Sequence, residues 1–323
     1  MGLVYASHHK YLQGRSMQTI AIAKCPAYER DLIHRQMDTI MGALGFSLPR
    51  PSKVLLKPNL VAAKTRHALS CTHPEFVAAI AQWLIDAGHS VSIGDSPAFG
   101  SALQVMRKCG YADAFGKLPV KLVDFKTVQK IRLAGGAMVS VARQALECDF
   151  LINLPKLKAH SQLYVSLAVK NFFGVVVGWR KAMIHVRYGD RSDCFESLLV
   201  DLLSLFPESL SVIDGIHAME CTGPMKGDRF DLGLIGAGTN PVALDTAFLE
   251  IIGAEGVKSP IWRQCAQRNL QGVDPGDLQF PLLTPRQVKV CDFALPGTLK
   301  PVTFHPLHMA KGTCKRVIAG LKP

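Results

Sequence analysis

Lysines within apolar sequence are the residues of this chain with the clearest capacity for chemistry. Three lysines and a histidine lie within fifteen residues of mostly apolar sequence: Lys156, Lys158, His160 and Lys170. A lysine is costly to bury unless it is paired. If Lys170 faces a sheet, we expect it to meet an anion or a carboxylate such as Asp95 or Asp214. The alternative is a lysine on a helix surface with its ammonium group in water.

Carboxylates follow other short apolar runs. Asp95 follows the run 90–94, and Asp214 follows the run 210–213, with Glu220 a few residues further on. Two carboxylates beside Gly-rich backbone can hold a cation or a sugar hydroxyl. Asp95 also suits a helix cap, which is the commoner role for an aspartate after a strand. Asp245 lies in the first turns of a helix, where it can complement the helix dipole.

These residues predict one ligand site, because ligands of open α/β sheets bind beyond the carboxyl ends of the strands. Lysines supply charge to phosphate or carboxylate, and asparagines orient the ligand. The predicted anion-binding residues are Lys57, Asn59, Lys156, Lys158 and Asn171. The predicted catalytic residues are His160 for proton transfer, Lys170 and Asp214. The predicted ligands of a divalent cation are Asp95, Asp214 and Glu220.

Several established chemistries are not encoded in this sequence. It contains no Cys-x-x-Cys pair, so it has no iron–sulfur cluster motif and no zinc ribbon. It also lacks the P-loop, H-E-x-x-H and G-x-S-x-G motifs. The nine cysteines are widely scattered, which is typical of buried, reduced thiols.

The elements that must position these residues alternate between strands and helices. Apolar runs predict strands over 53–60, 90–94, 120–125, 150–154, 210–214 and 232–236. Helical spacing predicts helices over 27–44, 73–87, 101–109, 161–176, 194–206, 241–252 and 259–269, of which 161–176 is either one helix or a helix with a break at Gly174. This alternation predicts an α/β fold with a mainly parallel sheet and helices on both faces. We expect a lead-in over 1–50 with one helix, a core over 51–275 and a basic, irregular extension over 276–323.

Charge and composition narrow the class of protein. The chain has 323 residues, of which 48% are hydrophobic, and a formal net charge of +12. This composition supports a large core and excludes disorder as the default. A basic chain attracts anionic small molecules, nucleic acid or acidic partners. The N-terminus has no apolar signal region and no stretch is long enough to span a membrane, so we expect a cytoplasmic protein.

The order of these short motifs resembles the bacterial and archaeal domain-of-unknown-function family 362. The resemblance covers about residues 54–253. The motifs that carry it are Lys57-Pro58-Asn59, Gly94-Asp95-Ser96, 155–160, Lys170-Asn171, 214–216, Met219-Glu220, Gly223-Pro224 and 240–245. Many members carry a ferredoxin-like segment with two four-iron clusters, which implies a redox setting. This chain lacks that segment, and it has Cys221 where relatives usually have glycine.

We therefore expect an enzyme or cofactor-handling protein that binds an anionic small molecule, with a link to redox chemistry and a divalent metal. Two alternatives remain open at this stage. One is a protein that binds nucleic acid or an acidic partner, although few aromatic residues are present for base stacking. The other is a partner of a separate ferredoxin-type protein, or a maturation factor, without catalysis of its own.

Overall fold

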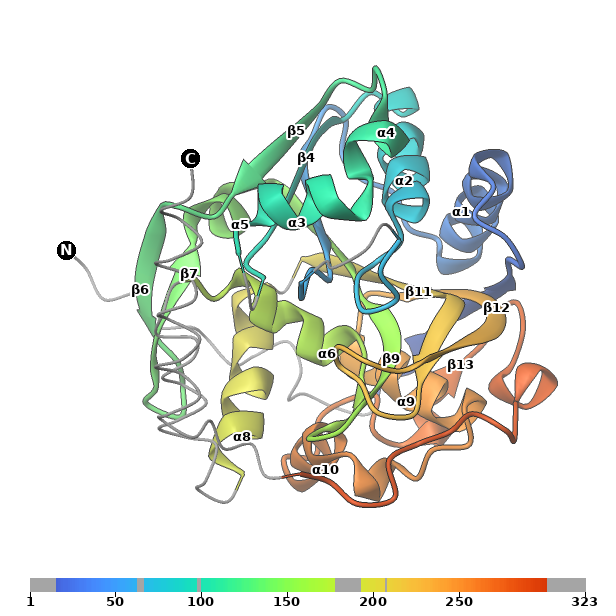
Figure 1. The fold of residues 1–323 in the computed structure, drawn as a ribbon. Helices are drawn as coiled ribbons and strands as arrows, with labels where there is room; N and C mark the ends of the chain where they lie inside the picture. Colours follow the sequence, from blue (N-terminus) through green and yellow to red (C-terminus); the bar gives the residue numbers. More distant parts are fainter. Residues whose placement is uncertain (1–15, 63–66, 98–99, 178–192, 207, 301–323) are drawn as a thin grey trace.

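A large sheet with helices on both faces forms the centre of the molecule (Figure 1). The structure is a computed structural model, and it describes residues 16–62, 67–97, 100–177, 193–206 and 208–300. Within these residues the central sheet has nine strands. The predicted α/β fold with a mainly parallel sheet is confirmed.

The parallel part of the sheet has the strand order β11-β8-β3-β4-β5. Its central strand, β3, is buried from its second residue to its last, as expected for a strand covered on both faces. The strands of this part are β3 (Lys53–Pro58), β4 (Ser90–Asp95), β5 (Val120–Asp124), β8 (Phe150–Leu154) and β11 (Ser209–Glu220).

Strand β11 is long enough to pair with two successive strands. Its start pairs with β8, and its continuation pairs with β9, which begins directly after Pro155. In this register Asp214 lies opposite Lys156. The remaining strands of the central sheet are β9 (Lys156–His160), β10 (Tyr164–Ser166), β12 (Asp228–Gly238) and β2 (Ala21–Lys24). Strand β12 runs antiparallel to β11 and to β2.

Alternation along the strands divides the core between the two faces. Val54 and Leu56 point toward α1 (Arg30–Leu44), α2 (Pro74–Asp86), α3 (Ala102–Cys109) and α4 (Tyr111–Phe115). Leu55 points the other way, into a core formed with α6 (Ala168–Asn171), the 3-10 helix η1 (Phe172–Val175), α8 (Cys194–Asp201) and α10 (Pro260–Gln267). Helix α9 (Pro241–Ile251) packs beside α6 against β11 and β12.

Smaller elements complete the described fold. A hairpin of β6 (Val128–Arg132) and β7 (Met138–Ala142), followed by α5 (Arg143–Glu147), packs against the α8 side. Residues 276–300 contain β13 (Leu278–Gln279), which pairs with β1 (Gln18–Thr19), so this stretch lies on the core. The other 3-10 helices are η2 (Leu202–Leu205), η3 (Gly256–Lys258), η4 (Pro275–Asp277) and η5 (Pro285–Val288).

One local prediction was wrong. The segment 161–176 is not one helix, because Tyr164–Ser166 pairs with β9 before α6 begins. The N-cap of α2 is His73, since the His73 side chain accepts the backbone N–H of Glu75. The Thr72 hydroxyl donates to the Leu154 carbonyl, so it joins the start of α2 to the end of β8.

Candidate functional site

Lys57 and Asp95 form a fully buried ion pair where β3 and β4 end. The Lys57 ammonium lies 2.9 Å from Oδ1 of Asp95, and the side chains are 0% and 3% exposed. The backbone N–H of Leu60 donates to the other carboxylate oxygen, at 2.8 Å. Burial lowers the pKa of Lys57, whereas Asp95 opposes that shift. The two predicted residues are therefore partners of each other.

Helix η1 places a glycine against this ion pair. A Cβ atom on Gly174 would lie 1.9 Å from Oδ1 of Asp95 and 2.4 Å from the Lys57 ammonium. The Gly174 carbonyl also accepts the backbone N–H of Ser96, at 2.9 Å. Only glycine allows the backbone to approach the pair this closely.

Lys158 enters the same region from β9, and it has no carboxylate partner among the described residues. Its ammonium donates to the backbone carbonyl of Ser70, at 2.8 Å. Burial and, to a smaller extent, the positive charge of Lys170 lower the pKa of Lys158 to about 7. The charged form of Lys158 is therefore destabilised by burial.

Lys170 lies on α6, half-buried, beside the other two lysines. Within the described part of the chain, its ammonium makes no hydrogen bond or ion pair. Burial lowers the pKa of Lys170 to about 8; the charge of Lys57 adds to this effect and Asp95 opposes it. We call Lys57, Asp95, Lys158 and Lys170 the lysine cluster.

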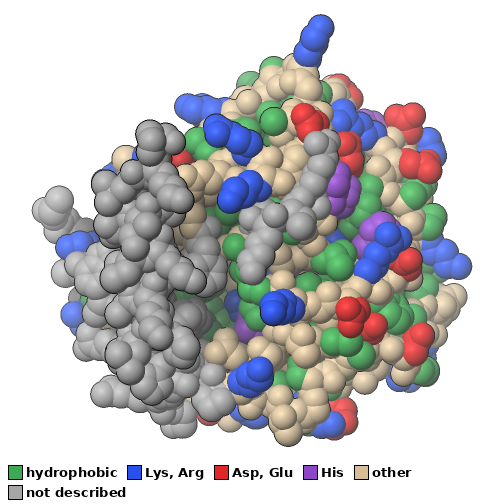
Figure 2. Space-filling view, in the orientation of Figure 1, with side chains coloured by type: hydrophobic (Ala, Val, Ile, Leu, Met, Phe, Trp, Pro, Cys, Tyr) green, Lys and Arg blue, Asp and Glu red, His purple; other side chains and the backbone are tan. Residues whose placement is uncertain are grey.

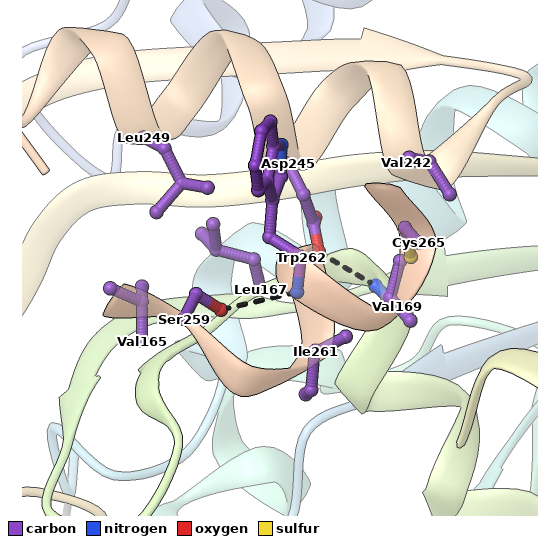
Figure 3. Close-up of a pocket in the computed structure, with 10 residues that line it drawn as sticks. All are labelled: Val165, Leu167, Val169, Val242, Asp245, Leu249, Ser259, Ile261, Trp262 and Cys265. Atoms are coloured by element: carbon purple, nitrogen blue, oxygen red, sulfur yellow. Dashed lines mark hydrogen bonds between the residues drawn. The ribbon is translucent and has the colours of Figure 1, made fainter. Parts of the chain in front are cut away.

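Asp245 on α9 fixes the start of the helix that carries Lys170. Its carboxylate accepts the backbone N–H groups of Ala168, at 2.7 Å, and of Val169, at 3.2 Å; Figure 3 shows the second of these bonds. Burial raises the pKa of Asp245 to about 8, although both hydrogen bonds favour the ionised form. The adjacent cavity measures only about 10 Å³, about the volume needed for one water molecule. Asp245 is thus a positioning residue for α6.

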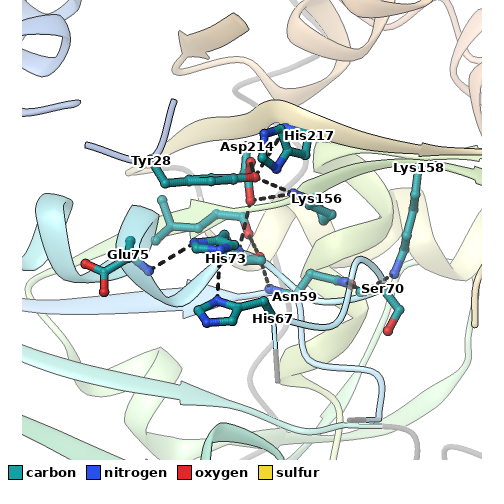
Figure 4. A network of polar contacts seen from close by, with 12 residues as sticks. Tyr28, Asn59, His67, Ser70, His73, Glu75, Lys156, Lys158, Asp214 and His217 are labelled. Carbon is teal, nitrogen blue, oxygen red and sulfur yellow. Dashed lines mark hydrogen bonds and ion pairs between the residues drawn. The ribbon is translucent and has the colours of Figure 1, made fainter. Parts of the chain in front are cut away.

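A second polar group surrounds Asp214 (Figure 4). Its carboxylate accepts the Lys156 ammonium at 2.9 Å, the Tyr28 hydroxyl at 2.8 Å and the His73 backbone N–H at 2.9 Å. Lys156 also donates to the Tyr28 oxygen, at 2.8 Å. Burial raises the pKa of Tyr28 well above its usual value, and the Asp214 charge adds to this. Lys156 is therefore neutralised within the protein.

Histidines surround Tyr28, and the sequence analysis did not find this arrangement. The His73 ring stacks on Tyr28 with ring centres 3.7 Å apart, and His217 meets Tyr28 edge-on at 4.9 Å. His67 lies beyond His73, and their ring nitrogens are 3.0 Å apart. Tyr28 comes from the lead-in before α1, so no local motif could have connected it with Asp214.

Other predicted site residues make structural contacts. The Asn59 amide donates to the Ser70 carbonyl, and the Asn171 amide donates to Asn153 and to the Lys57 carbonyl. The ring Nδ1 of His160 accepts backbone N–H groups of the turn that follows β9. Glu220 accepts the backbone N–H of Ala294.

The predicted metal ligands are not brought together. Asp95 and Asp214 pair with different lysines, and Glu220 holds the segment around Ala294. Among the described residues, no three His, Cys, Asp or Glu side chains form a group that could hold a metal ion. The physical reason is that each carboxylate already has its own buried or backbone donor.

A cavity of about 250 Å³ opens at the loop after β3. His67 and Ser70 line it from that loop, and Met219 and Met225 are among its other lining residues. Met219 lies opposite Lys158 in the register of β11 and β9. Ser70 therefore lines the cavity and also accepts the hydrogen bond from the Lys158 ammonium.

The fold and this site define an α/β protein with buried lysines at the carboxyl edge of its sheet. The chain belongs to the family described as domain of unknown function DUF362, whose model matches residues 54–250. It is 33% identical over 313 residues to a thylakoid-associated protein of Synechocystis sp., covering 93% of this chain and 94% of that protein.

Two solved structures are similar over part of the chain. One is the lactate racemase apoprotein of Thermoanaerobacterium thermosaccharolyticum, with 14% identity and a TM-score of 0.38 over 62% of this chain and 51% of that one. The other is a protein of Thermotoga maritima, with 12% identity and a TM-score of 0.43 over 76% of this chain and 60% of that one. This chain thus spans about half of the racemase.

Among the helices of the described ranges, none combines the length and the apolar character that crossing a bilayer requires. The cytoplasmic location stays a prediction. The relative from Synechocystis sp. is named as thylakoid-associated.

Proposed function

We propose that this protein binds a small molecule through a phosphate or carboxylate group at the carboxyl edge of its sheet. The observation that carries the proposal is the charge of the lysine cluster. Lys57, Lys158 and Lys170 are buried or half-buried around a single carboxylate, Asp95. An anion bound there would balance the positive charge that Asp95 leaves uncompensated.

The energetics of burial support this proposal. A buried charge without a partner is costly, and proteins retain one where it has a function. Burial lowers the pKa of both Lys158 and Lys170 toward neutrality, to about 7 and about 8. A bound oxyanion would favour their charged forms through Coulomb attraction and charge-assisted hydrogen bonds.

The proposed anion site contains fewer residues than the set of anion-binding residues that the sequence predicted. Lys156 is satisfied by Asp214 and Tyr28, so it contributes no excess charge. The Asn59 amide donates a hydrogen bond to the backbone of the loop after β3, and the Asn171 amide donates one to the backbone of β3. We assign the anion to Lys158 and Lys170, with Lys57 and Asp95 behind them.

A competing role in nucleic-acid binding would place cations on the surface rather than in the interior. On the face shown in Figure 2, the described Lys and Arg side chains are interspersed with Asp and Glu. Such a mixed surface favours the small-anion proposal over a binder of the nucleic-acid backbone.

Isothermal titration calorimetry with inorganic phosphate and with malonate tests the proposal. We expect Lys170→Gln to weaken binding at least tenfold, because the variant loses a charged contact worth about 1.4 kcal/mol or more. Lys121→Gln is the matched control, since Lys121 is exposed on β5. The proposal fails if neither anion binds the wild-type protein, or if both variants bind as the wild type does.

A further inference from the structure

Cys71 and Cys109 bring two buried thiols together at the end of α3. Both are free cysteines of one core cluster, and the Cys109 thiol donates a hydrogen bond to the Cys71 sulfur. The segment 68–71 is a turn in which the backbone N–H of Cys71 donates to the Ala68 carbonyl, at 2.9 Å. The backbone N–H of His67 donates to the Cys109 carbonyl, at 3.3 Å. The loop after β3 therefore packs directly on the C-terminal end of α3.

The surroundings of Cys71 favour its thiolate form. The hydrogen bond from Cys109 lowers the pKa of the Cys71 thiol, although burial opposes this effect. The backbone N–H of Val61 and the positive charge of Lys158 also lower that pKa. The same hydrogen bond, together with burial, raises the pKa of Cys109. Cys71 is therefore the nucleophile of the pair, and Cys109 is the thiol that can react with an oxidised Cys71.

The cavity at the loop after β3 gives small molecules a route to Cys71. Ala62 and Ser70 both line this cavity, whose volume of about 250 Å³ is enough for several water molecules. The Cys71 sulfur lies 3.9 Å from the Ala62 carbonyl oxygen and 3.9 Å from the Ser70 hydroxyl. The sulfur is therefore directly behind the cavity wall, within reach of an oxidant as small as hydrogen peroxide and shielded from the thiol of another protein.

We propose that Cys71 and Cys109 form a redox-active dithiol, which hydrogen peroxide oxidises to a disulfide that joins the loop after β3 to α3. The Cys71 thiolate attacks one oxygen of the peroxide, the O–O bond breaks and hydroxide leaves, which gives a sulfenic acid at Cys71. The Cys109 thiol then loses its proton and attacks the Cys71 sulfur, so the S–S bond forms and the S–O bond breaks with release of water. In total the two thiols lose two electrons and two protons, and the peroxide is reduced to two molecules of water.

The disulfide also changes the charge at the lysine cluster. The Cys71 thiolate offsets part of the charge of Lys158, whose ammonium donates to the Ser70 carbonyl, one residue before Cys71. Oxidation removes this negative charge, so Lys158 attracts a bound anion without a competing thiolate. We expect the oxidised protein to bind inorganic phosphate more tightly than the reduced protein, by about fivefold or more. This last expectation rests on the proposed function.

Peptide mapping of the wild-type protein tests the disulfide. Trypsin places Cys71 in the peptide 67–107 and Cys109 in the peptide 109–117, and each peptide contains one cysteine. After treatment with hydrogen peroxide and alkylation in denaturant without reduction, we expect these two peptides to be joined, with the mass of two hydrogen atoms lost. Dithiothreitol should separate them. Cys148, whose pKa is raised to about 11 by burial, should stay reduced and be alkylated.

Two single variants distinguish the roles of the thiols. We expect Cys109→Ser to leave Cys71 as a sulfenic acid, which dimedone traps, and Cys71→Ser to leave Cys109 reduced. Cys148→Ser is the matched control and should form the link at the wild-type rate. The inference is wrong if peroxide leaves both wild-type peptides alkylated and separate, or if Cys109 is oxidised as readily without Cys71.

Calorimetry with inorganic phosphate on the reduced and the oxidised protein separates this inference from the proposed function. If the disulfide forms and phosphate then binds more tightly, both are supported. If the disulfide forms but phosphate binds the two forms equally, the coupling to Lys158 is wrong and the dithiol stands. If phosphate binds neither form, the proposed function fails, whereas the peptide map still decides on the dithiol.

Discussion

The buried and half-buried lysines of the described residues have different sets of acceptors, and that difference separates structural from functional charge. Lys57 has a carboxylate, Lys156 has a carboxylate and a phenol, and Lys158 has one backbone carbonyl. Lys170 has no acceptor among the described residues. We infer that the first two stabilise the sheet edge, and that the last two await a ligand.

The pair of Lys57 and Asp95 gives a prediction at the scale of the residue. Asp95→Asn leaves the Lys57 ammonium buried without a counter-charge, so the free energy of unfolding should fall by about 3–5 kcal/mol. Urea denaturation measures this change. Glu147→Gln is the control, because it breaks an exposed pair with Arg143 and should cost less than about 1 kcal/mol. Equal effects of the two variants would contradict our account of the buried pair.

Residue types predicted some members of the site and not others. Lys57, Lys158 and Lys170 could be found because lysine in apolar sequence is unusual. His67, His73 and Tyr28 could not be found, because their role depends on contacts between the lead-in, the loop after β3 and β11. His160 was predicted to transfer protons, whereas its Nδ1 accepts hydrogen bonds from a turn.

At the scale of the element, α6 and η1 place both Lys170 and Gly174 against the sheet edge. Asp245 holds the first turn of α6, and the Asn171 amide ties its end to Asn153 and β3. This short segment has few helical hydrogen bonds of its own, so tertiary contacts determine its position. The sequence predicted a longer helix here because apolar residues are continuous through the segment.

Gly174→Ala tests how tightly η1 packs on the ion pair. The new methyl group would overlap Asp95 and Lys57, so we expect the free energy of unfolding to fall by more than about 2 kcal/mol. Gly42→Ala, within α1 and with no atom within 4 Å of its new methyl group, should instead raise it by about 0.5–1 kcal/mol. Thermal or urea unfolding distinguishes the two. A neutral Gly174→Ala would show that η1 can move away from the pair.

At the scale of the whole molecule, the sheet brings two polar groups of different charge to one edge. The Asp214 group is balanced by Lys156, whereas the lysine cluster has more cations than carboxylates. The difference arises from register, because Asp214 lies opposite Lys156 while Lys158 lies opposite Met219. One strand pairing therefore decides which lysine is neutralised.

The whole-protein stability should depend on pH through Lys158 and Lys170. Their pKa values, about 7 and about 8, lie below the ordinary lysine value of 10.5. Between pH 7 and pH 10 the unfolded chain therefore binds more protons at these two lysines, so their contribution to the free energy of unfolding should rise with pH. Asp245, with its pKa raised to about 8, contributes with the opposite sign, and so do the buried thiols of Cys25 and Cys148, whose pKa values are also raised. Malonate affinity should fall over the same window, since the lysines lose their charge.

Urea denaturation from pH 7 to pH 10 checks the stability, and calorimetry checks the affinity. In the double variant Lys158→Met with Lys170→Met, we expect the slope of the free energy of unfolding against pH to be less positive than in the wild type. If the double variant keeps the wild-type slope, these lysines do not carry this part of the pH dependence.

The sequence by itself determined the α/β class, the positions of the strands in the parallel part of the sheet and of the longer helices, and the unusual lysines. These follow from periodicity and local composition, which a single segment carries within itself. Tertiary structure decided which lysine meets which carboxylate, since strand register and the placement of α6 depend on contacts between distant segments. It also decided that Tyr28, His73 and His67 meet near one cavity, because packing of the lead-in and the loop after β3 against the sheet brings them there.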